Sequence, residues 1–404
     1  LAESLRVNKT YDYESFRLST GGLIYRLLNL FHIQQPGSYC LKRRHLVLIT
    51  LCWLPLLMLT AVEGTLFNTS IDSPFIYDLT PYVRYLIVLP LLINADIIID
   101  QLIVSVLQSI STSGILGDDN KDKYNKAVEK LSQRKDSYIA DIVIVVISYS
   151  VVLSYLTILE ELNVSTVFTN WITTHGDAGT QLSNAGWWFV LVSSPVLQII
   201  LYRWFWRFYL WVEFLYRISR INLKLQPTHP DLAGGLGILK NGESAFILIA
   251  IAFGALLSAG LAEDILYTDV TLLQSLPDIL GFIIIAIILM TLPMFFFTKQ
   301  LAMTRRWGRV VYGDLGHRLS IAFDNKWGDK SDESNGDELL KTADSSVVCD
   351  YADIYNVVDN MRYMPISLKG YFLQLSVLAI PFIPLILTEY SLTEILKRVI
   401  DTLI

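Results

Sequence analysis

The sequence predicts an all-α membrane protein, a polytopic bundle of transmembrane helices, and three observations support this class. First, the 404 residues are 53% hydrophobic and only 17% charged, whereas a soluble domain has about 25% charged residues. Second, the apolar residues form blocks of membrane-crossing length, which is about 20 residues for a helix. Third, the connections between these blocks alternate between basic and acidic composition, which is typical of a chain that crosses a bilayer repeatedly.

Residues 1–44 are expected to form a cytoplasmic N-terminal segment. They begin with a polar stretch in which we see no cleavable signal sequence. Residues 22–33 are apolar but interrupted by Arg26 and His32, and this run is too short to span a bilayer. We therefore expect a helix that lies at the membrane interface, with a helix in a soluble core as the alternative.

Six spans are predicted within residues 45–298, which we treat as one transmembrane domain. Pro55 lies inside the first span, and membrane helices tolerate proline because neighbouring groups satisfy the freed carbonyl. The fourth span is the longest, and its second half is aromatic and contains two arginines. The six predicted spans are, approximately, residues 45–62, 82–111, 137–159, 186–214, 244–262 and 279–298.

The charges of the connections predict which end of each helix faces the cytoplasm. The connection 113–136 is rich in Lys and Arg, and Lys or Arg residues also follow the fourth and sixth spans. By contrast, the connections 63–81 and 160–185 carry acidic residues and neither Lys nor Arg. The positive-inside rule then places the N-terminus and residues 113–136, 217–243 and 299–369 in the cytoplasm of a multi-pass protein.

Residues 299–369 are expected to form a cytoplasmic helical hairpin. A basic amphipathic stretch opens this segment, and a helix at about 347–362 returns to the membrane. Between them, residues 324–346 are polar and contain glycine, which predicts a mobile loop. A segment of about 60 residues, part of it loop, makes a poor independent core, so we expect no separate enzyme domain here.

Residues 370–404 are expected to form a C-terminal membrane segment followed by an amphipathic helix. The apolar run at 370–388 is long enough to cross, but Pro381 and Pro384 interrupt it. It therefore either spans the bilayer as a seventh helix, which we favour, or enters and folds back. The predicted architecture is six spans plus this proline-broken seventh span or re-entrant element.

Four stretches of the sequence form a recognisable set of motifs. They are WLPLLMLTAVEG (53–64), VRYLIVLPLLINAD (83–96), PTHPDLAGGLGIL (227–239) and MRYMPISLKGYFLQLSVLAIPFIPLIL (361–387). In order and spacing they resemble an uncharacterised family of bacterial polytopic inner-membrane proteins, in which Glu is usual where this chain has Asp96. The resemblance implies an all-helical fold in a bacterial inner (cytoplasmic) membrane, and it implies no particular activity.

Two intramembrane charge pairs are the first candidate site. Asp96 and Asp100 in the second span are four residues apart, so they lie on one helix face. Arg203 and Arg207 in the fourth span have the same spacing. Both spans run inward, and their lengths put Asp96 roughly 21 Å and Arg203 roughly 25 Å from the outer ends. The pairs therefore reach similar depths, where arginine can bind a carboxylate through two hydrogen bonds.

We expect an aspartate of one pair to contact an arginine of the other, and three roles for this contact remain open. The pairs lock the second helix to the fourth, or they line a polar path or ligand site, or the arginines extend to the lipid headgroups. The neighbouring Trp204 and Trp206 are placed to add cation–π contacts.

A loop before the fifth span is the second candidate site, and it contains His229, Asp231, Gly234, Gly235 and Gly237. Glycines permit a positive φ and close backbone approach, and successive N–H groups can bind an anion. A tight structural turn is the alternative to contact with a phosphate, headgroup or ion. The Gly-Gly-x-Gly sequence lacks the P-loop pattern, and one His with one Asp is an incomplete metal site.

The remaining polar residues predict no catalytic, metal or cofactor site. Cys40, Cys52 and Cys349 are far apart and match no metal or redox spacing. His175 and Asp177 lie in an outer loop and are too isolated to indicate catalysis. The net charge is −6 and no basic run indicates nucleic-acid binding. We expect membrane lipids as partners, and a homo-oligomer remains an open option.

Three functions are compatible with the sequence. The first is a channel- or transporter-like protein with a polar path near the second, fourth and fifth helices. The second is a non-conducting membrane scaffold or assembly partner that binds through its cytoplasmic hairpin. The third is a lipid-phosphate enzyme that uses the glycine loop. A water-filled cavity at the charge pairs favours the first function, and a dry, fully paired core favours the second.

Overall fold

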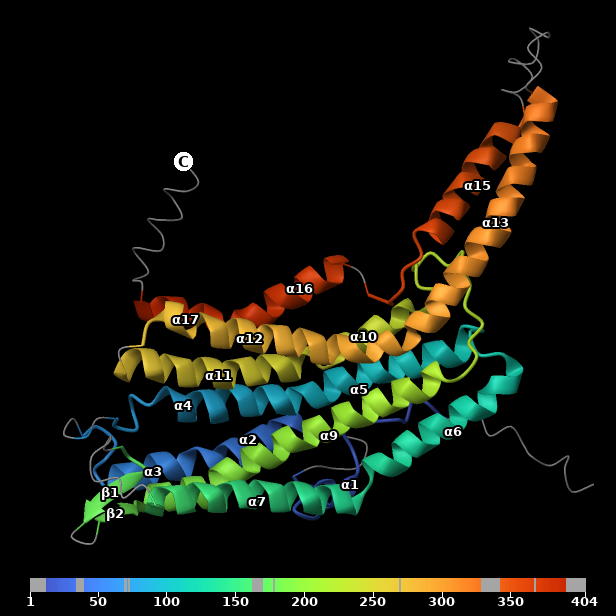
Figure 1. Ribbon diagram of the computed structural model, residues 1–404. Coiled ribbons are helices and arrows are strands. Elements are labelled where there is room, and N and C mark those ends of the chain that lie inside the picture. The colour runs from blue at the N-terminus through green and yellow to red at the C-terminus, as the bar shows by residue number, and fades with distance from the viewer. Residues whose placement is uncertain are drawn as a thin grey trace, which may run out of the picture.

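The chain folds into one bundle of long helices with a two-helix arm that projects from one end (Figure 1). The structure, a computed structural model, describes residues 12–33, 40–68, 71, 73–161, 170–176, 179–268, 270–327, 342–366 and 368–389. Seven helices in this described part are long and apolar enough to cross a membrane. The predicted class, an all-α polytopic bundle, is therefore confirmed, and the chain is an integral membrane protein.

Each candidate span is one helix or a series of short helices joined end to end. They are α2 (Leu41–Cys52) with α3 (Leu54–Val62); α4 (Leu79–Tyr82), η1 (Val83–Val88) and α5 (Leu89–Thr112); α7 (Tyr138–Glu161); α8 (Asn184–Trp188), η2 (Phe189–Ser193) and α9 (Ser194–Ser219); η3 (Leu236–Ile238), α10 (Leu239–Ala245) and α11 (Ile247–Tyr267); α12 (Leu272–Thr291), η4 (Leu292–Phe297) and α13 (Thr298–Trp327); and α16 (Leu368–Ala379), η5 (Ile380–Phe382) and α17 (Ile383–Glu389). The proline-broken run near the C-terminus is thus helical throughout and of membrane-crossing length.

Prolines explain where the helical geometry changes. A proline has no N–H and crowds the carbonyl four residues before it, so the helix rearranges locally. Pro90 and Pro195 each follow a π-helical turn, η1 and η2 respectively, and these wider turns accommodate the freed carbonyl groups. Pro293 and Pro381 lie within the 3-10 turns η4 and η5.

The basic connection between the second and third spans is a helix, although the sequence analysis treated it as a loop. This helix, α6 (Asp118–Lys135), buries Tyr124, Val128 and Leu131 along one face. Their spacing of three or four residues is the amphipathic pattern of a helix that packs on a core. Many Lys residues lie between these apolar residues, so a search for membrane-length apolar runs did not reveal the pattern.

Two further short elements are present. A short antiparallel hairpin of β1 (Thr173–Gly176) and β2 (Gly179–Leu182) lies in the connection between the third and fourth spans, which the sequence predicted to be a loop. The helix expected at 22–33 is present as α1 (Gly22–Leu30), and it packs against α7.

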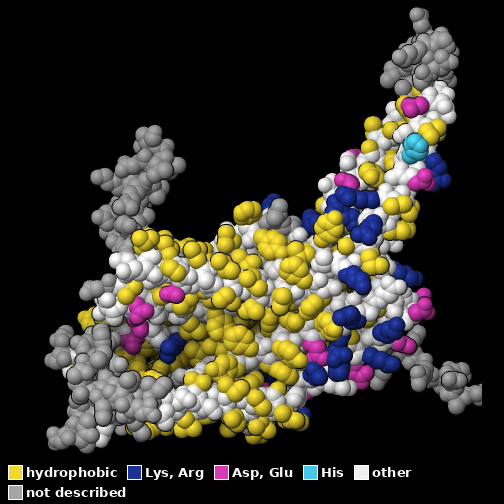
Figure 2. Space-filling view, viewed as in Figure 1, with side chains coloured by type: hydrophobic (Ala, Val, Ile, Leu, Met, Phe, Trp, Pro, Cys, Tyr) yellow, Lys and Arg dark blue, Asp and Glu magenta, His cyan; other side chains and the backbone are white. Residues whose placement is uncertain are grey.

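The surface of the bundle has the polarity expected of a membrane protein. Apolar side chains cover the middle of the face shown in Figure 2, and Lys and Arg gather at the end from which the arm projects. We call this end the basic end and the opposite one the acidic end. Leu153 on α7 and Ile285 on α12 are 62% and 59% exposed. Exposed apolar side chains of this size fit contact with lipid rather than with water.

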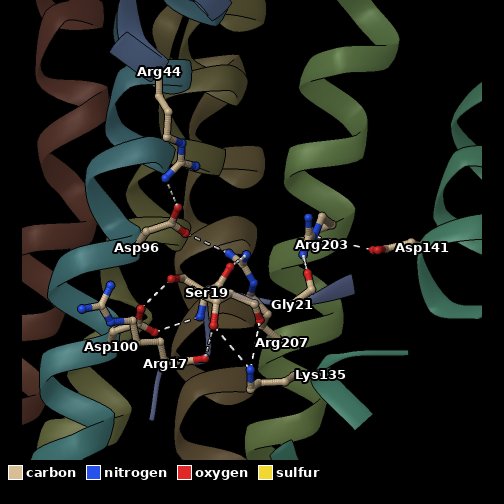
Figure 3. A network of polar contacts seen from close by, with 11 residues as sticks. Arg17, Ser19, Gly21, Arg44, Asp96, Asp100, Lys135, Asp141, Arg203 and Arg207 are labelled. Carbon is tan, nitrogen blue, oxygen red and sulfur yellow. Dashed lines mark hydrogen bonds and ion pairs between the residues drawn. The ribbon is translucent and has the colours of Figure 1, made fainter. Parts of the chain in front are cut away.

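The chain just before α1 is buried inside the bundle. Phe16, Leu18 and Ser19 are only 4%, 1% and 3% exposed. We call residues 16–21 the N-terminal wedge, because they occupy the space between the membrane helices at the level of the predicted charge pairs (Figure 3). The wedge is therefore part of the core.

The arm consists of α13, which continues the sixth span, and α15 (Asp344–Asp359) packed against it. Glycines allow this close packing: a Cβ atom at Gly308 would lie 3.0 Å from the Val358 Cγ1, and one at Gly316 would lie 2.9 Å from the Tyr351 ring. Most of the loop expected at 324–346, and the tail helix expected after residue 389, lie outside the described residues.

The two-ended charge distribution generates a topology prediction. In a background without native cysteines, we expect Ser320→Cys in the arm to react with an impermeant maleimide only from the cytoplasmic side of oriented vesicles. Phe67→Cys, which is exposed at the acidic end, should react only from the opposite side. Labelling of Phe67→Cys from the cytoplasmic side would reverse the assignment.

Candidate functional site

A buried network of charges joins five segments of the chain, the N-terminal wedge and helices α2, α5, α7 and α9, and Asp96 lies at its centre (Figure 3). The Arg44 Nη1 of α2 lies 2.6 Å from the Asp96 Oδ2. The Arg207 Nη1 of α9 donates a hydrogen bond to the Asp96 Oδ1 at 2.9 Å. The contact predicted between the second and fourth spans is therefore present, and one carboxylate is held by arginines from two helices.

The second aspartate of the pair is bound by the N-terminal wedge. Asp100 accepts hydrogen bonds from the Ser19 backbone N–H at 2.9 Å and from the Ser19 hydroxyl at 2.5 Å. Arg207 also donates to the Ser19 carbonyl oxygen, and its guanidinium lies 4.5 Å from the Trp204 ring centroid. Ser19 therefore links the two helices, with its donors on Asp100 and its acceptor on Arg207.

Arg203 has different partners from those expected. Its Nη2 donates to the Gly21 carbonyl oxygen at 2.8 Å, and its Nε lies 3.7 Å from the Asp141 Oδ1 on α7. Gly21 has a φ of 104°, and a Cβ atom there would lie 1.8 Å from the Asp136 Oδ1. Only glycine can therefore present this carbonyl to the arginine.

The core of the network pairs aspartates with arginines. Three aspartates (Asp96, Asp100 and Asp141) face three arginines (Arg44, Arg203 and Arg207), and all but Arg203 are less than one-tenth exposed. Pairing of this kind is what makes buried charge tolerable within a membrane. Four cavities found among the described residues are lined by other side chains. The network residues therefore do not line any of these four cavities.

The sequence did not identify four residues of this network: Arg44, Asp141, Ser19 and Gly21. Arg44 lies just before the predicted first span, and Asp141 lies inside the predicted third span. A charged residue within a span is the signal that identified the others, and Asp141 carried it. The wedge contributes mainly backbone groups, and no side-chain pattern could have identified Ser19 or Gly21 as partners.

A cavity of about 510 Å³ opens at the acidic end of the same helices. Its walls come from the second, third, fourth and fifth spans and from the hairpin region. Both π-helical turns border it: η1 contributes Arg84, and η2 contributes Phe189 and Val190. Such turns are rare and are frequent at functional sites. Gln198, the deepest polar residue of α9 in this cavity, lies only five residues, about 7.5 Å, before Arg203.

Two carboxyl groups converge at the mouth of this cavity. The Thr80 backbone N–H lies 2.9 Å from the Asp78 Oδ1 and 3.0 Å from the Glu263 Oε1. The Trp171 indole N–H donates to the Asp78 Oδ2 at 2.7 Å. Burial raises the pKa of Asp78 to about 7, and the adjacent Glu263 adds to the rise, while the Trp171 and Thr80 donors oppose it. Burial and the neighbouring carboxyl group therefore both favour the protonated form of Asp78.

The cavity also holds polar groups without a protein partner. The Arg84 guanidinium lies 5.6 Å from the Phe189 ring centroid and makes no ion pair within the described residues. The Gln198 Oε1 is buried and accepts no hydrogen bond among these residues, although its Nε2 donates to the Ser194 hydroxyl at 3.0 Å. A cation and a hydrogen-bond acceptor are thus available to a bound solute.

The glycine loop at the basic end is a turn closed by its own carboxylate. Asp231 accepts hydrogen bonds from the N–H groups of Ala233, Gly235 and Gly237 at 2.8, 3.1 and 2.8 Å. Burial alone would raise the pKa of Asp231, but these three donors outweigh it and hold that pKa below its usual value. The predicted nest of N–H groups exists, and an internal anion occupies it.

The other residues of this loop serve the same turn. The His229 Nδ1 lies 2.8 Å from the Asp231 Oδ1. Gly234 and Gly235 have φ values of 65° and 96°, which favour glycine. Within the described ranges no group of three or more His, Cys, Asp or Glu residues could hold a metal ion. The side chain of His175 and all of Asp177 lie outside the described residues.

Comparisons of the chain with protein-family models, with curated proteins and with solved structures give no match. The family resemblance noted from the motifs therefore remains a prediction, and the function has to be argued from the geometry of the sites.

The central carboxylate of the network generates a stability prediction. Asp96→Asn leaves Arg44 and Arg207 without their shared counter-charge, and removal of one partner of a buried pair costs about 3–5 kcal/mol. Thermal unfolding of the purified protein should show this loss. The control Asp122→Asn removes the same charge from the exposed face of α6. Equal unfolding temperatures for the two variants would contradict the central role of Asp96.

The glycine loop generates a second, independent prediction. Gly235→Val should lower the yield of folded protein far more than His229→Ala. Valine is strained at this φ, and its Cβ would lie 2.9 Å from the Ile115 Cδ1. Size-exclusion profiles of the two variants measure the yield. A normal profile for Gly235→Val would argue against the structural role of the turn.

Proposed function

We propose that this integral membrane protein is transporter-like and that the structure corresponds to a state open at the acidic end and closed at the basic end. One observation carries the proposal. The second and fourth spans line a cavity of about 510 Å³ in one half of the bundle and carry the charge network in the other. A pocket of this size with a few polar groups on apolar walls is typical of small-molecule sites.

The proposal assigns a side to each end. Lys and Arg gather at the basic end, so by the positive-inside rule this end and the N-terminus face the cytoplasm. The cavity would then take a solute from the opposite side of the membrane. We propose a bacterial inner membrane as the location, on the motif resemblance alone.

The chemistry of the cavity favours a small organic solute that carries a positive charge. Asp78, Glu263 and Asp264 outnumber the single cation, Arg84. Aromatic rings of Trp171 and other wall residues offer further favourable contacts to a cation. Loss of a proton from Asp78 near pH 7 makes the cavity more negative, which links solute binding to proton release.

The charge network supplies the barrier on the other side. Passage to the cytoplasm would require the Asp96 pairs to separate and the N-terminal wedge to move. The π-helical turns η1 and η2 lie on the acidic-end side of the network, in the two helices that carry Asp96 and Arg207. We propose that rearrangement of these turns transmits solute binding to the network.

A membrane scaffold is the second candidate, and one observation favours it. The arm exposes large apolar side chains, including Met303, Trp307 and Val310, which are 62%, 55% and 68% exposed. A scaffold also needs no aqueous path through the charge network, so paired charges in its core are compatible with this function. We do not propose the lipid-phosphate enzyme, because Asp231 already occupies the N–H groups that such an enzyme would use.

Solute binding and its pH dependence test the transport proposal. We expect choline, spermidine or lysine to raise the unfolding temperature of the purified protein at pH 8. The effect should weaken as the pH falls through 7, by at most about tenfold in affinity per pH unit for one linked proton. Glu263→Gln should lose the effect, and the surface control Glu129→Gln should keep it.

Flux separates transport from simple binding. A solute that stabilises the protein should accumulate in proteoliposomes, and Asp78→Asn should remove the pH dependence of that uptake. Binding without any flux would favour the scaffold, and failure of every cation in the panel to bind would contradict the proposed cavity chemistry.

A further inference from the structure

A second polar cavity, of about 400 Å³, lies at the basic end between α6 and the end of α9. Its cationic lining comes from both helices: Lys123, Lys126 and Lys130 from α6, and Arg217 and Arg220 from α9. We propose that this cavity binds the phosphate headgroup of an anionic phospholipid from the cytoplasmic leaflet. The inference is independent of the transport proposal, which concerns the opposite end of the bundle.

The positive charge of this cavity is only partly neutralised by carboxylates among the described residues. Lys126 and Lys130 make no ion pair within the described residues. Arg217 pairs with Glu213 at 2.5 Å, but Arg134 contacts the same carboxylate from the other side. Arg220 lies over the Tyr216 ring and donates to its hydroxyl at 2.9 Å. The cavity therefore keeps a surplus of cations, and a phosphate is the simplest group that would balance them.

An apolar groove in line with the cavity indicates a lipid rather than a free anion. The groove has a volume of about 860 Å³ and lies between α7 and α9. Ile139 and Val143 line its α7 side, and Phe205 and Tyr209 line its α9 side. Ile139 is 75% exposed and Tyr209 is 50% exposed, so the groove is open to the membrane.

The α9 residues that line the groove and those that line the cavity lie on one face of this helix. The groove residues Phe205 and Tyr209 are followed by Glu213, Arg217 and then Arg220 at intervals of three or four residues. Residues at this spacing lie above one another along a helix. Tyr209 and Arg220 are 11 residues apart, or about 16 Å along the axis. An acyl chain in the groove would thus place its headgroup in the cavity.

The charge also selects the kind of lipid. A zwitterionic headgroup would bring its ammonium group among the five cations, where repulsion opposes binding. Basic pockets between membrane helices on the cytoplasmic side are recognised sites for anionic headgroups. The expected ligand is therefore a phospholipid with a net negative charge, with its phosphate between α6 and α9.

Lipid binding to the full-length protein tests this inference. We expect native mass spectrometry to show dioleoyl-phosphatidylglycerol bound in preference to dioleoyl-phosphatidylcholine, which has identical chains. The double variant Lys126→Gln, Lys130→Gln should weaken phosphatidylglycerol binding about 30-fold, because each lysine near such a surface contributes about a fivefold factor. The control Lys42→Gln, Lys121→Gln removes two charges from the basic end outside the cavity and should leave binding unchanged.

A groove variant and a soluble probe distinguish the source of the phosphate. Val143→Trp fills the groove, so it should weaken phosphatidylglycerol binding without changing the unfolding temperature of the lipid-free protein. Inorganic phosphate should bind more than tenfold more weakly than the lipid and should be insensitive to Val143→Trp. Equal loss in the control double variant, no preference over phosphatidylcholine, or phosphate binding as tight as that of the lipid would each overturn the inference.

Discussion

The Asp96 carboxylate, held between two arginines inside the bundle, is the interaction on which the rest of the structure depends. A charge in the membrane interior is stable only when its partners are fixed around it. Arg44 and Arg207 meet this need from α2 and α9. Ser19 donates a hydrogen bond to Asp100 and accepts one from Arg207. One electrostatic constraint therefore fixes the positions of three membrane helices and draws the N-terminal wedge into the core.

The charge network divides the bundle into two unlike halves. Towards the acidic end, the π-helical turns that precede Pro90 and Pro195 border a cavity whose mouth carries the Asp78 and Glu263 carboxyl groups. Towards the basic end, the glycine turn is closed by its own Asp231. The unneutralised cations there face the surface between α6 and α9 instead. A cavity at the acidic end and a cation-lined surface cavity at the basic end thus lie on either side of the charge network.

The sequence could predict the parts of this structure that depend on hydrophobicity and helical spacing. Membrane-length apolar runs predicted the helix class and the spans, and the four-residue spacings at matched depth predicted that Asp96 or Asp100 contacts Arg203 or Arg207. These patterns did not specify that Asp96 pairs with Arg207 or that Arg44 joins them, because depth along a helix does not specify which neighbour lies opposite. Ser19 acts partly through backbone groups, which carry no side-chain signal. The helix α6 was missed because its apolar face is short and its composition is basic.

The central claim is that water reaches from the acidic end to Gln198 and stops at the charge network. Single cysteines along α9 test it most directly, through their reaction rates with a small water-soluble maleimide in proteoliposomes. Ser194→Cys and Gln198→Cys should react from the acidic side, whereas Leu201→Cys and Leu210→Cys, whose native side chains are 7% and 1% exposed, should stay unreactive. Rapid labelling of Leu210→Cys from the acidic side would show a continuous aqueous path and contradict the claim, as would complete protection of Gln198→Cys.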